Sequence, residues 1–211
     1  MRDWLNETLP FLIEAFASDF GGHDVEHTLR VYRLAMAIWE KEGGDGETIA
    51  LAALLHDVDD YKLTGGPMGD TSRAEAFMAE HGVSLDKIKT VTKIIAEISF
   101  KSRGTVTPAT LEGKIVQDAD RLDAIGAVGI ARTFAYGGSK GRPLYIRGES
   151  YALDMTAEEY AKHEGSSVGH FYEKLLKLKG LMNTETAKQL AAARHQFMED
   201  FLAELSAECF L

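Results

Sequence analysis

The nine residues Leu54-Leu55-His56-Asp57-Val58-Asp59-Asp60-Tyr61-Lys62 place an imidazole and three carboxylates directly after an apolar run that begins at Ile49. Burying such groups beside a core costs on the order of several kcal/mol unless a partner neutralises them. A divalent metal ion suits both donors, because His56 offers a nitrogen and Asp57 an oxygen. Asp60 follows His56 by four residues and would share a helical face with it. We therefore expect further ligands from other parts of the chain.

Two other segments carry candidate ligands at helical positions. His27 follows an expected helix start at Asp24. The segment 117–124 places acids at 118, 120 and 123 within an otherwise apolar helix. A helix with that much apolar surface is expected to be central, so its acids need partners.

Composition and charge limit the class of protein. A length of 211 residues suits one domain, and 45% hydrophobic with 27% charged residues is ordinary for a soluble globular protein. The formal net charge of −10 argues against duplex nucleic acid as a partner. A small anionic substrate stays possible, because a metal ion and a few Lys or Arg side chains can reverse the local field.

The cysteine count and the N-terminus predict a cytoplasmic protein. Cys209 is the one cysteine, so no disulfide can form within the chain, and we interpret it as a packing residue. Residues 1–7 lack the basic region and apolar run of a signal peptide. The longest apolar run, 124–131, is too short to span a bilayer, so no membrane partner is expected.

Apolar periodicity predicts helices throughout and no convincing strand. Helices are expected at residues 2–18, 24–42, 47–57, 72–81, 84–99, 111–134, 167–178 and 184–208, with a capping box at Thr156 and Glu159. The basic segment 137–151 is long for a compact domain and typical of a lid or binding loop. The sequence thus predicts a compact all-α single domain over residues 1–211.

The ordered pattern of His27, His56-Asp57 and Ala119-Asp120 resembles the HD-domain superfamily of metal-dependent phosphohydrolases. His-Thr-Leu-Arg-Val around His27 is similar to that family's first helix. The segments KIVQDADRLDAIGAVGIAR, HDVDDYK and HFYEKLLKL look like a bacterial branch of small predicted hydrolases, some of them nucleotide pyrophosphohydrolases. The resemblance covers about residues 20–205, with the core signature in 20–135 and the helices of 156–208 completing the domain.

The resemblance implies one divalent ion, whether Mn, Fe, Co, Ni, Zn or Mg. Its implied ligands are His27, His56, Asp57 and Asp120. Asp118 competes for the last place, but the two acids point about 200° apart on a helix, so only one is expected to bind. Asp120 is favoured because an Ala-Asp pair with Leu two residues later matches the family's last ligand. Asp118 and Asp123 are expected to orient a ligand or a water molecule.

The resemblance also implies the chemistry. Four protein ligands on a six-coordinate ion leave two positions for water and a phosphate oxygen. Asp60 is expected to position or deprotonate the attacking water. Helical proximity to the ligands, apart from the resemblance, makes Lys62 a candidate to meet the phosphate, and the position of Asp59 in the acidic run leaves it to face solvent. The candidate cations for phosphate oxygens are Arg30, Arg33, Arg121, Arg132, Lys140, Arg142 and Arg147.

The favoured function is hydrolysis of nucleoside triphosphates to monophosphate and pyrophosphate. One alternative is a phosphatase acting on nucleoside 5′-monophosphates, and another is a metal-retaining domain that senses a nucleotide without catalysis. The sequence does not fix the base, the scissile bond or the oligomeric state, and an oligomer is compatible with it.

A peptidase is the fourth possibility. The residues His23-Asp24-Val25-Glu26-His27 match the H-x-x-E-H pattern of one class of zinc peptidases. His23 follows two glycines directly, before the expected helix is established, and the pattern leaves His56-Asp57 without a role.

Overall fold

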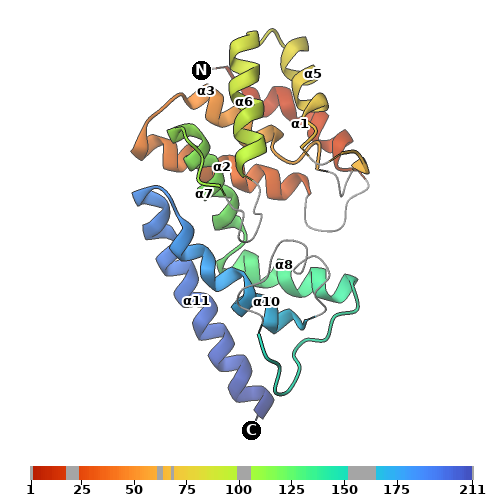
Figure 1. The fold of residues 1–211 in the computed structure, drawn as a ribbon, viewed down its shortest axis with the longest axis vertical. Coiled ribbons are helices and arrows are strands. Elements are labelled where there is room, and N and C mark those ends of the chain that lie inside the picture. The colour runs from red at the N-terminus through yellow and green to blue at the C-terminus, as the bar shows by residue number, and fades with distance from the viewer. Residues whose placement is uncertain are drawn as a thin grey trace. The chain divides into compact units, whose positions relative to one another are not determined.

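The structure is a computed structural model that describes residues 2–17, 24–60, 64–67, 69–98, 106–151 and 165–210. Within these residues it contains α-helices, one 3-10 helix and no strand, which confirms the all-α prediction (Figure 1). The helices are α1 Trp4–Ala15, α2 Val25–Glu42, α3 Gly46–Leu55, α5 Ser72–Glu80, α6 Leu85–Ile98, α7 Leu111–Asp123, α8 Gly126–Ser139, α10 Ser167–Glu173, the 3-10 helix η2 Leu175–Leu181, and α11 Glu185–Phe210. No helix in the described ranges is both long enough and apolar enough to cross a bilayer.

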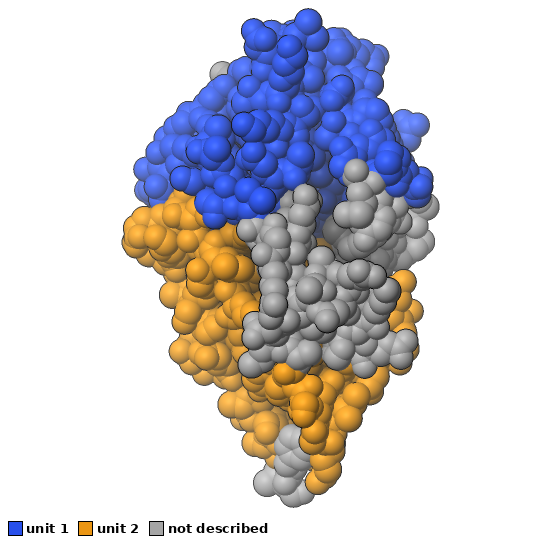
Figure 2. All heavy atoms as spheres, viewed as in Figure 1, with its two compact units in different colours: residues 1–99, 106–119 blue, residues 100–105, 120–211 orange. Residues whose placement is uncertain are grey.

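The chain divides into two compact units (Figure 2). Unit 1 comprises Met1–Ser99 and Val106–Ala119, and unit 2 comprises Phe100–Thr105 and Asp120–Leu211. Helix α7 contributes residues to both. The expectation that residues 1–211 form one domain stays a prediction.

Helix α3 is the centre of unit 1. Every residue of it except Glu47 is buried, and it packs against α1, α2 and α6. A helix that is apolar on all sides must be covered on all sides. The apolar run that precedes His56 in the sequence is therefore the core of this unit, and α3 ends at Leu55, one residue before that histidine.

Acidic caps fix where α2 and α3 begin. The Asp24 carboxylate accepts a hydrogen bond from the His27 backbone amide at 2.6 Å, as expected for the predicted start at Asp24. Asp45 caps α3 by accepting from the amides of Glu47 at 3.0 Å and Thr48 at 3.4 Å. Both caps set the helical register of the residues that follow them.

The single helix predicted over 111–134 is wrong, because the chain forms α7 and α8 with a break between them. Gly126 takes a φ of +76°, a conformation that favours glycine. The Arg194 guanidinium from α11 donates to the Leu122 carbonyl near the end of α7. A Cβ at Gly126 would lie 3.0 Å from Arg194 Cγ, so glycine also makes room for this arginine.

The helix predicted over 167–178 also divides. Helix α10 ends at Glu173, and after Lys174, with φ −136° and ψ −60°, the chain continues as η2. The last helix agrees with its prediction and begins after Thr184, whose hydroxyl accepts from the Ala187 amide at 3.3 Å. In unit 2, α11 packs against α8 and η2.

Candidate metal centre

Three side chains in unit 1 bring their donor atoms together at one point. His27 Nε2 and His56 Nε2 lie 3.3 Å apart. Asp57 Oδ2 lies 3.4 Å from the His27 nitrogen and 3.3 Å from the His56 nitrogen. The two rings meet edge to face with centroids 5.3 Å apart. The sequence predicted all three as ligands, and the structure brings them into one cluster.

Local structure orients the two imidazoles. His27 is buried in the first turn of α2, where the Asp24 cap holds its backbone. His56 Nδ1 lies 2.9 Å from the Ala53 carbonyl. A carbonyl only accepts, so Nδ1 donates this hydrogen bond, and Nε2 is the ring nitrogen that faces His27 and Asp57. Metal-binding histidines commonly have this arrangement.

The spacing of the three donors fits one metal ion. Nitrogen and carboxylate donors lie about 2.0–2.2 Å from an ion such as Zn²⁺, so neighbouring donors in a tetrahedral or octahedral set lie about 3.0–3.5 Å apart. The observed separations are 3.3 to 3.4 Å. Two imidazoles with a carboxylate suit first-row divalent ions from Mn²⁺ to Zn²⁺. The cluster supports the predicted divalent cofactor without selecting the element.

The acids of α7 occupy different environments. Asp118 is fully buried in unit 1, and Asp120, in unit 2, is half-buried. Asp123 is 1% exposed and pairs with Arg132 through Nη1 and Oδ2 at 2.7 Å. This ion pair gives Asp123 a partner within its own unit. The choice between Asp120 and Asp118 as fourth ligand stays a prediction.

The candidate phosphate-binding cations are spread over both units. Arg30 is half-buried on α2, one turn after His27, and Arg33 is exposed on the same helix. Arg121 of unit 2 is buried, and its guanidinium donates to the Leu181 carbonyl. The Arg121 guanidinium is thus used, at least at Nη1, in a contact within unit 2.

The basic residues after α8 lie beside an aromatic ring. Lys140 Nζ is 5.7 Å and Arg142 Cζ is 5.8 Å from the centre of the Tyr136 ring. Two predicted site residues, Lys62 and His23 of the peptidase pattern, lie outside the described residues. The roles of all these cations stay predictions.

The expectation that Asp59 faces solvent is wrong. Asp59 is 7% exposed, and its carboxylate accepts from the backbone amides of Arg73 at 3.2 Å and Ala74 at 3.0 Å. It therefore caps α5 from a position thirteen residues before that helix. Helix-start patterns in a sequence are local, so they carry no signal for a cap from this distance. Asp60 is half-buried and directly follows this residue.

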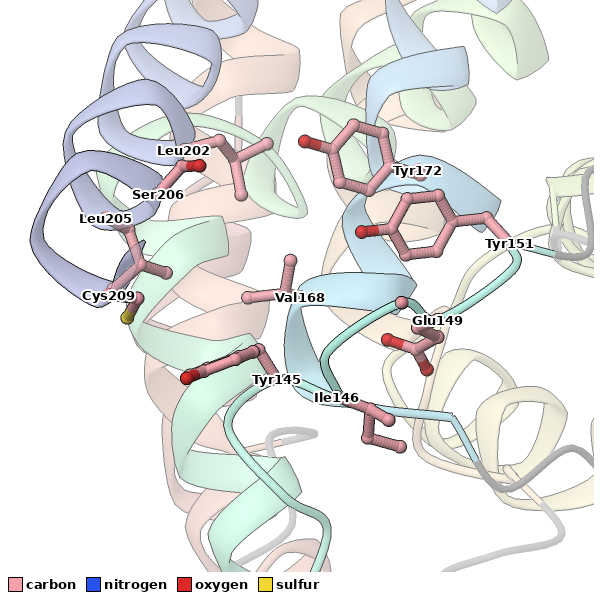
Figure 3. A pocket seen from close by; sticks show the side chains of 11 residues that line it. Tyr145, Ile146, Glu149, Tyr151, Val168, Tyr172, Leu202, Leu205, Ser206 and Cys209 are labelled. Carbon is pink, nitrogen blue, oxygen red and sulfur yellow. The ribbon is translucent and has the colours of Figure 1, made fainter. Parts of the chain in front are cut away.

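A pocket of about 210 Å³ in unit 2 contains none of the predicted site residues (Figure 3). Its walls include Tyr145, Glu149, Cys209 and the stacked rings of Tyr151 and Tyr172, whose centroids lie 4.3 Å apart. The Glu149 carboxylate accepts from the amide and the hydroxyl of Ser166. The pocket therefore offers phenol rings and an engaged carboxylate, and the described residues of its lining include no cationic side chain.

Comparison with known proteins yields a family and close relatives. Residues 24–125 match the model of the HD domain. The protein YpgQ of Bacillus subtilis is 40% identical over 210 residues, which cover 99% of this chain and 91% of YpgQ. Its crystal structure in complex with ADP superposes with a TM-score of 0.73, at 37% identity over 95% of this chain and 97% of that chain.

A second solved structure is described as an HD-superfamily hydrolase from Bacillus thuringiensis. It is 41% identical, covers 98% of this chain and 96% of its own, and has a TM-score of 0.77. A crystal structure of a Lactobacillus plantarum protein has a TM-score of 0.86 at 38% identity, over 99% of this chain and 97% of that one. These similarities extend over nearly the whole length of each protein.

Proposed function

The chain belongs to the HD-domain family of metal-dependent hydrolases, and on that premise we propose that it cleaves nucleoside triphosphates to the monophosphate and pyrophosphate. The observation that carries the proposal is the convergence of His27, His56 and Asp57 donor atoms within 3.4 Å of one another. The ADP bound to YpgQ supports a nucleotide as substrate.

The proposed roles divide between holding the ion and handling the substrate. His27, His56 and Asp57 hold a divalent ion, with Asp120 as the proposed fourth ligand. When bound, such an ion lowers the pKa of a coordinated water and offsets charge that develops on phosphorus. The ligand oxygen of Asp57 is an acceptor and must be unprotonated for binding.

Asp60 is the proposed general base. Its backbone amide donates to the Asp57 carbonyl at 3.0 Å, which ties its position to that of the ligand. Its half-buried carboxylate would accept a proton from the attacking water. Arg30, one turn after His27 on α2, is the proposed contact for a phosphate oxygen in unit 1.

A nucleotide panel tests the proposal. Purified protein is incubated with ribo- and deoxynucleoside mono-, di- and triphosphates in Mn²⁺, Co²⁺, Mg²⁺ or Ni²⁺, with phosphate and pyrophosphate measured separately. We expect pyrophosphate from triphosphates, and no release by the Asp57→Ala variant. Asp86→Ala, which changes an exposed aspartate of α6 in the same unit, serves as the control and should retain full activity.

Three results would contradict the proposal. Phosphate release from monophosphates alone would indicate the phosphatase. Metal-loaded protein that releases neither product from any nucleotide would indicate a non-catalytic domain. Loss of bound metal in His23→Ala, with metal retained in Asp57→Ala, would indicate the peptidase pattern.

A further inference from the structure

The ligands His56 and Asp57 lie on the turn that follows the last residue of α3. Helix α3 ends at Leu55. After it, the Val58 amide donates to the Leu55 carbonyl at 3.4 Å and the Asp60 amide to the Asp57 carbonyl at 3.0 Å. These bonds span three residues and the first is long. A turn of this kind needs other contacts if its side chains are to keep the geometry that a metal requires.

Asp59, two residues after Asp57, provides such contacts. Asp59 Oδ1 accepts from the Arg73 amide at 3.2 Å, and Oδ2 accepts from the Ala74 amide at 3.0 Å. Both amides belong to the first turn of α5, where backbone donors have no partner within the helix and the helix dipole favours an anion. The buried carboxylate is thus held at both oxygens by main-chain atoms of another helix.

Helix α5 returns a bond to the same turn. Arg73 Nη1 donates to the Val58 carbonyl at 2.9 Å, and the guanidinium lies 5.7 Å from the centre of the Phe11 ring. Three hydrogen bonds therefore join α5 to the two residues that follow Asp57. We call Val58, Asp59, Arg73 and Ala74 the turn clamp.

We propose that the turn clamp positions Asp57 and His56 for metal binding, with Asp59 and Arg73 as positioning residues that do not touch the ion. The clamp fixes the backbone next to Asp57, and so keeps Asp57 Oδ2 beside the two imidazole nitrogens. It also joins the two ends of the segment 60–72, which begins with the proposed base Asp60. The inference rests on the metal site of the proposed function, but not on the identity of the substrate.

The chain offers a matched pair of variants. Asp70 also caps α5, since its two oxygens accept from the Ser72 amide and the Ser72 hydroxyl, each at 3.0 Å. Neither of these bonds reaches residues 56–60. Asp59→Asn and Asp70→Asn therefore each remove one acceptor from the start of the same helix, and only the first loosens the ligand turn.

The measurement is Mn²⁺ and Co²⁺ binding to metal-stripped full-length protein by titration calorimetry, with circular dichroism to confirm folding. We expect Asp59→Asn to weaken affinity about 10- to 100-fold, the range for groups that support metal ligands, and to change the Co²⁺ visible spectrum. Asp70→Asn should stay within about twofold of the wild type. Excess metal should restore most of the turnover of Asp59→Asn on any substrate found in the nucleotide panel.

A second variant keeps the test valid if Asp59→Asn does not fold. Arg73→Gln removes the bond to Val58 but leaves both amide bonds to Asp59, and it should weaken Co²⁺ binding by about tenfold. Wild-type affinity in either folded variant, or equal losses in Asp59→Asn and Asp70→Asn, would overturn the proposal. A protein that binds metal but hydrolyses no nucleotide would refute the proposed substrate class, while the affinity comparison would still decide the role of the clamp.

Discussion

Asp57 in unit 1 and Asp123 in unit 2 are both shielded carboxylates, but different side chains lie beside them. Asp123 pairs with the Arg132 guanidinium at 2.7 Å, and it opposes the lowering of the Arg194 pKa that burial causes. Asp57 instead faces the Nε2 atoms of His27 and His56. An arginine is always cationic and forms a complete ion pair. The two imidazole nitrogens and the carboxylate oxygen are all atoms that can bind a metal ion, and they converge on one point.

We expect this difference to separate a metal ligand, Asp57, from an acid whose pairing with Arg132 stabilises the fold. Both aspartates look alike in sequence, as acids next to apolar helical residues. Asp123 has a cation beside it, whereas Asp57 lies beside two histidines and forms a cluster of three possible metal donors with them. Asp59 shows a third solution, in which two backbone amides of a helix donate hydrogen bonds to the carboxylate. The role expected for each of these aspartates thus follows from the groups that contact its carboxylate more than from its degree of burial.

Removing Asp57 should have the largest effect. Asp57→Ala takes away one of three converging donors, so we expect metal affinity to fall by more than about 100-fold, beyond the loss from a supporting residue. Nucleotide turnover should drop to background. Titration calorimetry with Mn²⁺ and the nucleotide panel provide the two measurements. If the Asp57→Ala variant still bound one metal ion per chain, Asp57 would not differ from Asp123 in metal binding.

Removing Asp60 should affect turnover alone. If Asp60 is the general base, Asp60→Ala lowers kcat by about 100-fold or more, and Mn²⁺ affinity stays near that of the wild type. The pair of measurements separates a group that moves a proton from one that holds the ion. Unchanged kcat in this variant would remove Asp60 from the mechanism.

Breaking the pair in unit 2 should affect stability and leave the metal in place. Arg132→Met leaves the buried Asp123 without its guanidinium, and we expect unfolding free energy to fall by about 1–3 kcal/mol. Urea unfolding of the metal-free protein measures this. Mn²⁺ affinity should change less than about twofold. A large loss of affinity would instead show that Asp123 orients a metal ligand or its water, as the sequence suggested.

The smallest expected effect concerns His170, a histidine of unit 2 that should influence stability and not metal binding. Burial, together with the nearby charges of Lys174 and Arg142, lowers the pKa of His170 to about 3. This folded-state pKa lies below the unfolded value of about 6.5. The unfolded chain therefore binds the proton first, and stability is lost as pH falls below about 6.5. We expect a loss of roughly 1 kcal/mol between pH 8 and pH 6, measured by urea unfolding, and a smaller one in His170→Gln. If the unfolding free energy of the wild type and of His170→Gln changed equally with pH, His170 would not be a source of the pH dependence.

Sequence reasoning predicted the helices whose apolar residues and caps are local. Asp24 before α2 and Thr184 before α11 are examples, because a cap acts within one turn. Residue types and helical positions marked His27, His56 and Asp57 as candidate ligands. The family resemblance was needed to assign them to one ion, since no periodicity shows that His27 lies beside His56. The break between α7 and α8 was missed, because the contact that stabilises it comes from a distant part of the sequence. Arg194 of α11 donates a hydrogen bond to the Leu122 carbonyl at the end of α7. The contacts of Asp59 with α5 were missed for the same reason.

The burial of α3 on every side has a consequence for biosynthesis. Helix α2 precedes α3 in the chain, but α6, which also covers α3, is made about thirty residues later. A nascent chain that has reached residue 60 therefore carries all three metal donors and an incompletely covered apolar helix. Incompletely covered apolar surface is prone to aggregation during synthesis. Until residues 85–98 leave the ribosome, α3 lacks the cover that α6 provides in the folded protein.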